Sequence, residues 1–118
     1  MGCTMIKTKE LECIMAQYYG TEHWYRYFPN ADFLYTDGVK TFCENAEAYW
    51  FLTEIFLATR GLPDDLYTIT LKVEGSSANI EINSEKKIKG WHIGFTDCPE
   101  GEWKFFYTNN VFMWKDEY

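Results

Sequence analysis

Residues 67–74 read Y-T-I-T-L-K-V-E, and this stretch decides the fold class. Each odd-numbered residue is apolar and each even-numbered one is polar or charged, a period of two that predicts a strand with one buried face. The sequence G-S-S at 75–77 predicts a turn, and the alternation resumes over 78–82. A β-hairpin is therefore expected at the centre of the second half of the chain.

Three more strands are predicted on the C-terminal side of this hairpin. Residues 86–95 alternate, but their phase slips near Gly90, where we expect a β-bulge. Residues 103–108 and 111–114 are separated by Asn109-Asn110, a pair that tolerates the positive φ of a tight hairpin turn. Together the five strands predict an antiparallel meander.

The N-terminal side has a helical period instead. Residues 5–17 predict a short amphipathic helix, and a longer helix is expected from Asp37, taken as its N-cap, to a stop at Gly61 and Pro63. Residues 18–36 show no clean period. The predicted fold class is α+β, with two or three N-terminal helices packed on one face of a five-stranded antiparallel meander sheet. We expect residues 1–118 to form a single α+β domain.

Composition and charge exclude several classes of function. The chain has 118 residues, 47% of them hydrophobic, and 11 basic against 18 acidic residues give a net charge of −7. Direct binding of nucleic acid or of an anionic membrane is therefore disfavoured. The four cysteines lie far apart in the sequence, which predicts free thiols, a reducing cytoplasmic location, and neither a metal site nor a cofactor. The cysteines are Cys3, Cys13, Cys43 and Cys98. We expect Cys13 and Cys43 to be buried on apolar helix faces.

The aromatic content is the feature that folding explains least. The 5 Trp, 9 Tyr and 9 Phe exceed what a core of this size absorbs, and several cluster near residues 18–36. Exposed Trp and Tyr are typical anchors of protein-binding surfaces. The candidate binding residues are Glu22, Trp24, Tyr25, Arg26 and Tyr27. The alternative interpretation is that these rings fill an aromatic-rich core.

A second interpretation of the same region is catalytic. His23 could act as a general base beside a carboxylate, and Arg26 could hold an anionic group by a two-pronged contact. The candidate catalytic residues, if the protein is an enzyme, are His23, Arg26, Tyr35 and Asp37. The alternative is structural, with Asp37 as a helix cap and Arg26 paired to a carboxylate. His92 is expected to be a solvent-facing strand residue, and the lysines at 86–89 to protect a sheet edge.

Three blocks of the chain resemble an uncharacterised bacterial family of unknown function. They are Y-G-T-E-H-W-Y-R-Y at 19–27, the segment 33–56, and G-F-T-D-C-P with T-N-N-V-F-M-W-K-D-E-Y near the end. The resemblance implies a bacterial, cytoplasmic protein of a kind often found on mobile elements and in phage-derived regions. The family brings no established activity. Glu47 replaces a frequent Gly, Thr53 replaces an Asp, and Cys98 replaces an aromatic residue.

These observations favour a small, acidic, non-enzymatic module that binds a partner protein. In its sharper form the hypothesis is an anti-defence inhibitor, similar in action to anti-CRISPR proteins, that docks on a host nucleic-acid-processing complex. The acidity is dispersed over both halves of the chain, which favours protein docking over mimicry of DNA. The alternatives are a small hydrolase or transferase and a homodimer formed through an exposed sheet edge.

Overall fold

The computed structural model describes residues 8–18, 23–27, 33–60, 62–63, 65–84, 87–96 and 98–117. The elements follow one another as α1 (Thr8–Met15), β1 (Trp24–Arg26), β2 (Leu34–Thr36), α2 (Asp37–Asn45), α3 (Tyr49–Thr59), β3 (Tyr67–Glu74), β4 (Ser77–Asn83), β5 (Lys87–Ile93), β6 (Gly101–Thr108), β7 (Val111–Trp114) and the short 3₁₀ helix η1 (Lys115–Glu117). The α+β class is thus confirmed.

The sheet has seven strands in the order β1-β2-β7-β6-β3-β4-β5, and only the β2–β7 pair is parallel. The predicted five-stranded antiparallel meander is therefore wrong in strand number and in connection. β1 and β2 have three residues each, too few to show a period in the sequence. β6 pairs with β3 rather than with β5, and these two eight-residue strands match over nearly their whole length.

The helices also differ from the prediction. The helix expected from Asp37 to residue 60 is two helices, separated at Glu47, whose φ is 52°. The N-cap of α2 is Thr36, not Asp37, and its Oγ1 accepts from the Val39 N–H at 3.5 Å. The helices are not all N-terminal, since β1 and β2 precede α2 and η1 follows β7. The prediction of a helix within 5–17 is confirmed for Thr8–Met15, and residues 5–7 lie outside the described residues.

Two predictions about turns in the sheet have different outcomes. Asn109 and Asn110 have φ values of 51° and 65°, so the predicted tight turn between β6 and β7 is confirmed. The bulge expected at Gly90 is wrong in position, because the register shifts where Ile82 and Asn83 pair with residues 89 and 87. The extra residue on β5 is therefore residue 88. The phase slip in the sequence correctly predicts an irregularity in this strand, but it places the bulge at the wrong residue.

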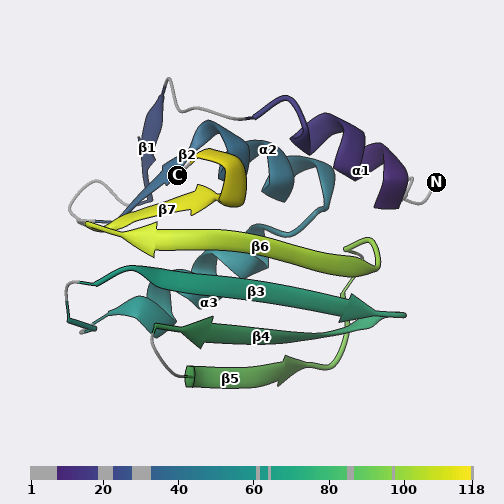
Figure 1. Ribbon diagram of the computed structural model, residues 1–118. Coiled ribbons are helices and arrows are strands. Elements are labelled where there is room, and N and C mark those ends of the chain that lie inside the picture. The colour runs from purple at the N-terminus through teal and green to yellow at the C-terminus, as the bar shows by residue number, and fades with distance from the viewer. Residues whose placement is uncertain are drawn as a thin grey trace.

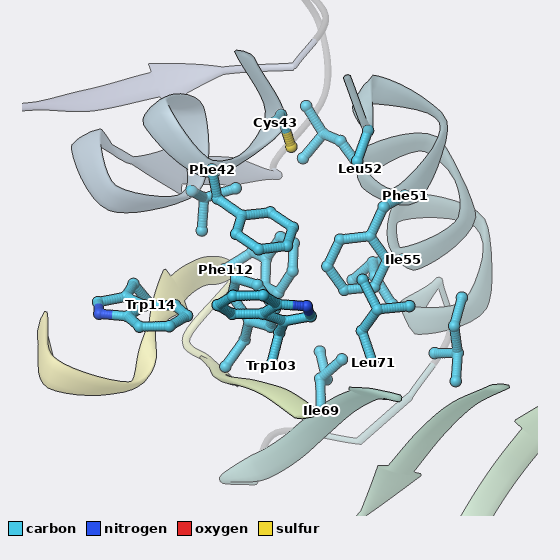
Figure 2. Close-up of a cluster of buried hydrophobic side chains, with 14 of the residues drawn as sticks. Phe42, Cys43, Phe51, Leu52, Ile55, Ile69, Leu71, Trp103, Phe112 and Trp114 are labelled. Atoms are coloured by element: carbon cyan, nitrogen blue, oxygen red, sulfur yellow. The ribbon is translucent and has the colours of Figure 1, made fainter. Parts of the chain in front are cut away.

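Aromatic rings fill the core between the helices and the sheet. Phe42 of α2 is fully buried, and its ring centroid lies 5.5 Å from that of Trp103 and 5.1 Å from that of Phe105. Figure 2 shows Phe42 and Phe51 pointing from the two helices toward Trp103 on the sheet. Burial of these large rings contributes strongly to the free energy of folding.

The three cysteines among the described residues differ in burial. Cys43 and Cys98 are buried, and burial raises the pKa of each to about 12. Cys13 is exposed on α1, so the prediction that it is buried is wrong. The apolar side of α1 is formed by Leu11 and Met15, which leaves Cys13 on the other side.

One face of the sheet is left open by the helices. Figure 1 shows α3 behind β3, so that the viewer looks onto the opposite face of the sheet. The side chains of this open face include Thr70, Lys72 and Glu81, which alternate with buried residues along β3 and β4. None of the helices in the described ranges is long and apolar enough to cross a membrane.

Candidate functional site

Asp37 ties β1 to the first turn of α2. Its Oδ2 accepts the backbone N–H of His23 at 3.2 Å and lies 3.3 Å from Nδ1 of the same residue. Its Oδ1 accepts the Tyr25 hydroxyl at 2.8 Å. A carboxylate in the first turn also interacts favourably with the helix dipole. We call His23, Tyr25 and Asp37 the Asp37 cluster, which fixes β1 against the helix.

The contacts of this cluster keep Asp37 ionised and Tyr25 neutral. Burial raises the pKa of Asp37, but hydrogen bonds from Tyr25 and His23 oppose it and leave the pKa below its ordinary 3.8. The hydrogen bond to Asp37 is the main cause that raises the pKa of Tyr25 above 10.0. The pair therefore consists of a charged acceptor and a neutral donor at neutral pH.

A second carboxylate, Glu117, lies at the same helix end. It accepts the backbone N–H groups of Gly38 and Trp114, both at 3.0 Å, and the hydroxyl of Thr36. Thr36 is fully buried as a result. A Cβ added to Gly38 would lie 2.3 Å from Oε1 of Glu117, so only glycine fits beneath this carboxylate. η1 therefore closes over the start of α2, as its place beside β7 in Figure 1 indicates.

The structure brings together some of the candidate catalytic residues and separates others. His23 and Asp37 are in contact, and Tyr35 stacks on Tyr25 with ring centroids 5.6 Å apart. Arg26 follows Tyr25 on β1, and strand alternation directs its exposed side chain to the opposite face of the sheet. The four residues therefore do not line one cleft.

The candidate binding residues divide in the same way. Tyr25 and Tyr27 face the helices, and the Tyr27 hydroxyl lies 2.5 Å from Oγ1 of Thr53 on α3. Trp24 and Arg26 face the open side of the sheet, and 55% of the Trp24 surface is exposed. Glu22 lies outside the described residues. The tyrosines thus hold the strand from one side while Trp24 and Arg26 are presented on the other.

Half-buried apolar side chains continue this open face beyond β1. The registers place Arg26 beside Leu34, Leu34 beside Val111, and the neighbouring pair Phe106–Met113 on the same side. We define the Trp24 patch as the six residues Trp24, Arg26, Leu34, Phe106, Val111 and Met113. The last four cannot be assigned to this face from the sequence, because their place on the same face as Trp24 depends on the parallel β2–β7 pair.

The other half of the open face is charged. A hollow of about 620 Å³ is lined by residues of β3, β4, β5 and β6, with Gly90 among them. Its charges are matched along the strands, with Lys72 3.5 Å from Glu74 and Lys104 3.5 Å from Glu102. His92 is exposed, as expected, and its Nδ1 lies 3.1 Å from Oδ1 of Asn79. This half therefore behaves as a solvated charged surface.

The chain belongs to a family of unknown function. The family described as "Family of unknown function (DUF6876)" matches residues 9–118, which confirms the resemblance to an uncharacterised domain family. No curated protein and no solved structure matches the chain. The interpretation of the site therefore rests on its geometry.

Proposed function

We propose that the protein is a non-enzymatic module that binds a partner protein through the Trp24 patch. The observation that carries this proposal is the exposure of Trp24 beside Arg26 on the open face of the sheet. Tryptophan and arginine are the residues most enriched among binding hot spots. Half-buried apolar neighbours would exclude water from their contacts.

The rigidity of the strand beneath the patch supports the same function. Tyr25 is held by Asp37, and Tyr27 is held by Thr53 and by the ring of Phe56, whose centroid lies 4.8 Å away. A strand fixed from behind loses little conformational entropy when its outer side chains meet a partner. These contacts support a docking role for Trp24 and Arg26.

The partner that we expect is a protein of a nucleic-acid-processing complex, with the module acting as its inhibitor. The net charge of −7 disfavours direct contact with nucleic acid. The proposed docking requires neither a cofactor nor contact with a membrane.

An affinity pull-down from a bacterial host tests this function, with Trp24→Ala and Arg26→Ala compared with the wild type. We expect each variant to bind the co-purified partner at least about tenfold more weakly, because both side chains lie at the proposed contact. Phe95→Ala is the matched control, since Phe95 is 70% exposed but lies outside the patch.

Two outcomes would contradict the docking function. The first is a preparation from which no protein co-purifies. The second is a partner that folded Trp24→Ala and Arg26→Ala variants retain as tightly as the wild type does. If the retained partner is a nuclease complex that stays active when bound, the inhibitory role is wrong and the docking role stands.

A second candidate function, a small hydrolase or transferase, is favoured by the His23–Asp37 contact of 3.3 Å. With its proton on Nδ1, His23 would donate to Asp37 and keep Nε2 as a general base, and 67% of its side chain is exposed. A panel of chromogenic carboxylate and phosphate esters tests this candidate. Turnover that His23→Ala abolishes would support it, and absence of turnover would exclude it for those substrate classes.

A further inference from the structure

The outer side of α3 is largely apolar and, apart from the contacts of Tyr27 with Thr53 and Phe56, is left exposed by the described residues. The helix has the sequence Y-W-F-L-T-E-I-F-L-A-T, with Glu54 as its single charged residue. A helix that is apolar on most sides is normally buried. In this fold, however, Tyr49 is 46% exposed and Leu57 is 54% exposed. The apolar composition of α3 therefore indicates that its exposed side contacts another molecule.

The exposed residues have the spacing of a helix pair. Trp50, Thr53, Leu57 and Arg60 recur at alternating intervals of three and four residues along α3 and its C-cap. This is the spacing of residues that line the seam between two packed helices. Thr53, Leu57 and Arg60 are exposed, and Trp50 is half-buried. We call these four residues the α3 stripe.

The local charges of α3 are compatible with a second copy of this chain as the occupant of the stripe. Two copies with a net charge of −7 each repel one another at long range, so their interface must offset this repulsion by its own contacts. Glu54 accepts the indole N–H of Trp91 at 2.7 Å, so its carboxylate is engaged within its own chain. The α3 stripe itself carries no acidic residue.

The charges that flank α3 are self-complementary. Exposed Glu47 precedes the helix and exposed Arg60 follows it. In an antiparallel pair centred between Thr53 and Glu54, Glu47 of one copy lies opposite Arg60 of the other. The same symmetry places Trp50 opposite Leu57, as a two-fold interface requires.

The backbone at Glu47 explains how this residue comes to flank α3. Its φ of 52° is the left-handed conformation that commonly follows a helix C-cap, and it lets the Ala48 N–H donate to the Cys43 carbonyl at 2.9 Å, which ends α2. The same turn leaves the Glu47 side chain exposed just before α3 begins. We propose that two copies of this chain associate through antiparallel α3 helices, with Glu47 and Arg60 forming reciprocal ion pairs across the interface.

Analytical ultracentrifugation over a wide range of concentrations tests this proposal. We expect a reversible dimer with a dissociation constant in the micromolar range or weaker, because one helix pair forms a small interface. Leu57→Asp should raise that constant at least about tenfold, and Leu66→Asp should leave it unchanged. Leu66 is the matched control because it is 36% exposed and lies outside α3.

A charge exchange separates this interface from a change in folding. Glu47→Arg and Arg60→Glu should each weaken the dimer, and the double variant should restore it, because the pairs are reciprocal. Circular dichroism on heating checks that every variant folds. A wild type that stays monomeric at about 1 mM overturns the proposal. So does a dimer that Leu57→Asp and both charge reversals leave intact. Trp24→Ala should keep the dimer, so the two surfaces can fail separately.

Discussion

The two ends of the sheet are built in different ways. β3, β4 and β6 have seven or eight residues, alternate in burial and pair along nearly their whole length. β1 and β2 have three residues each, and the carboxylates of Asp37 and Glu117 connect this end of the sheet to α2. Long strands are stabilised by their own pairing, whereas the short ones depend on side chains from elsewhere in the chain. The end with the Trp24 patch is therefore the easier one to disturb.

The largest expected effect is loss of the core that both ends share. Phe42→Ala should lower the free energy of unfolding by about 3–5 kcal/mol, because a fully buried ring leaves a cavity between α2 and β6. Urea denaturation followed by circular dichroism measures this change. A loss below about 1 kcal/mol would mean that the core closes around the cavity and that the two ends are not coupled through Phe42.

The second largest effect is expected at Glu117 and should destabilise only one end of the sheet. Glu117→Ala removes the acceptor for Gly38, Trp114 and Thr36, and should cost about 1–3 kcal/mol. Amide hydrogen exchange should become faster in β2, β7 and the first turn of α2, and stay unchanged in β3 and β4. Gly38→Ala should have the same pattern, because its Cβ would displace Glu117. If amide protection were lost equally along the whole sheet, the view that the two ends depend on different contacts would be wrong.

A smaller effect, with a distinct dependence on pH, is expected at Asp37. Asp37→Asn should cost about 1 kcal/mol at neutral pH, since hydrogen bonds to a charged acceptor and the favourable contact with the helix dipole are weakened. The pKa of Asp37 is below 3.8 in the fold, so the carboxylate adds stability above pH 3.8 that is lost as the pH falls through the lowered pKa. The difference between wild type and variant should therefore shrink in acid. A difference that is constant from pH 7 to about pH 2 would exclude this role.

The smallest effect is expected in the charged half of the open face. Lys72→Ala should change the free energy of unfolding by less than about 0.5 kcal/mol, because exposed ion pairs contribute little. The stability of this variant at low and at high salt should be nearly equal. A loss above about 1 kcal/mol would show that the long strands also depend on side-chain pairs.

The difference between the long strands and the short strands also decides which elements could be predicted from the sequence. The alternation of β3 and β4 is strong because one face is buried, and the Asn109-Asn110 turn has a specific backbone requirement. β1 and β2 are too short to show a period, and the partner of β2 is β7, far away in the sequence. No local pattern encodes a parallel pair between such distant strands.

The candidate site was accessible to sequence reasoning only in part. The block around Trp24 is conspicuous for its aromatic residues, and the sequence predicts His23 and Asp37 as catalytic candidates, which are in contact in the structure. Alternation on β1 separates Arg26 from them, and this separation follows only once the strand is recognised. Glu117 could not be predicted, because its carboxylate reaches the helix end through η1 and not through any sequence motif.

The parallel pairing of β2 with β7 has a consequence for synthesis on the ribosome. Chains grow from the N-terminus at a few residues per second, and early segments wait for partners that are made later. β2 remains without its β7 neighbour until Val111–Trp114 has left the exit tunnel. The nascent chain therefore carries the aromatic residues of β1 and β2 without their sheet until β7 emerges, and only then can the Trp24 patch be completed.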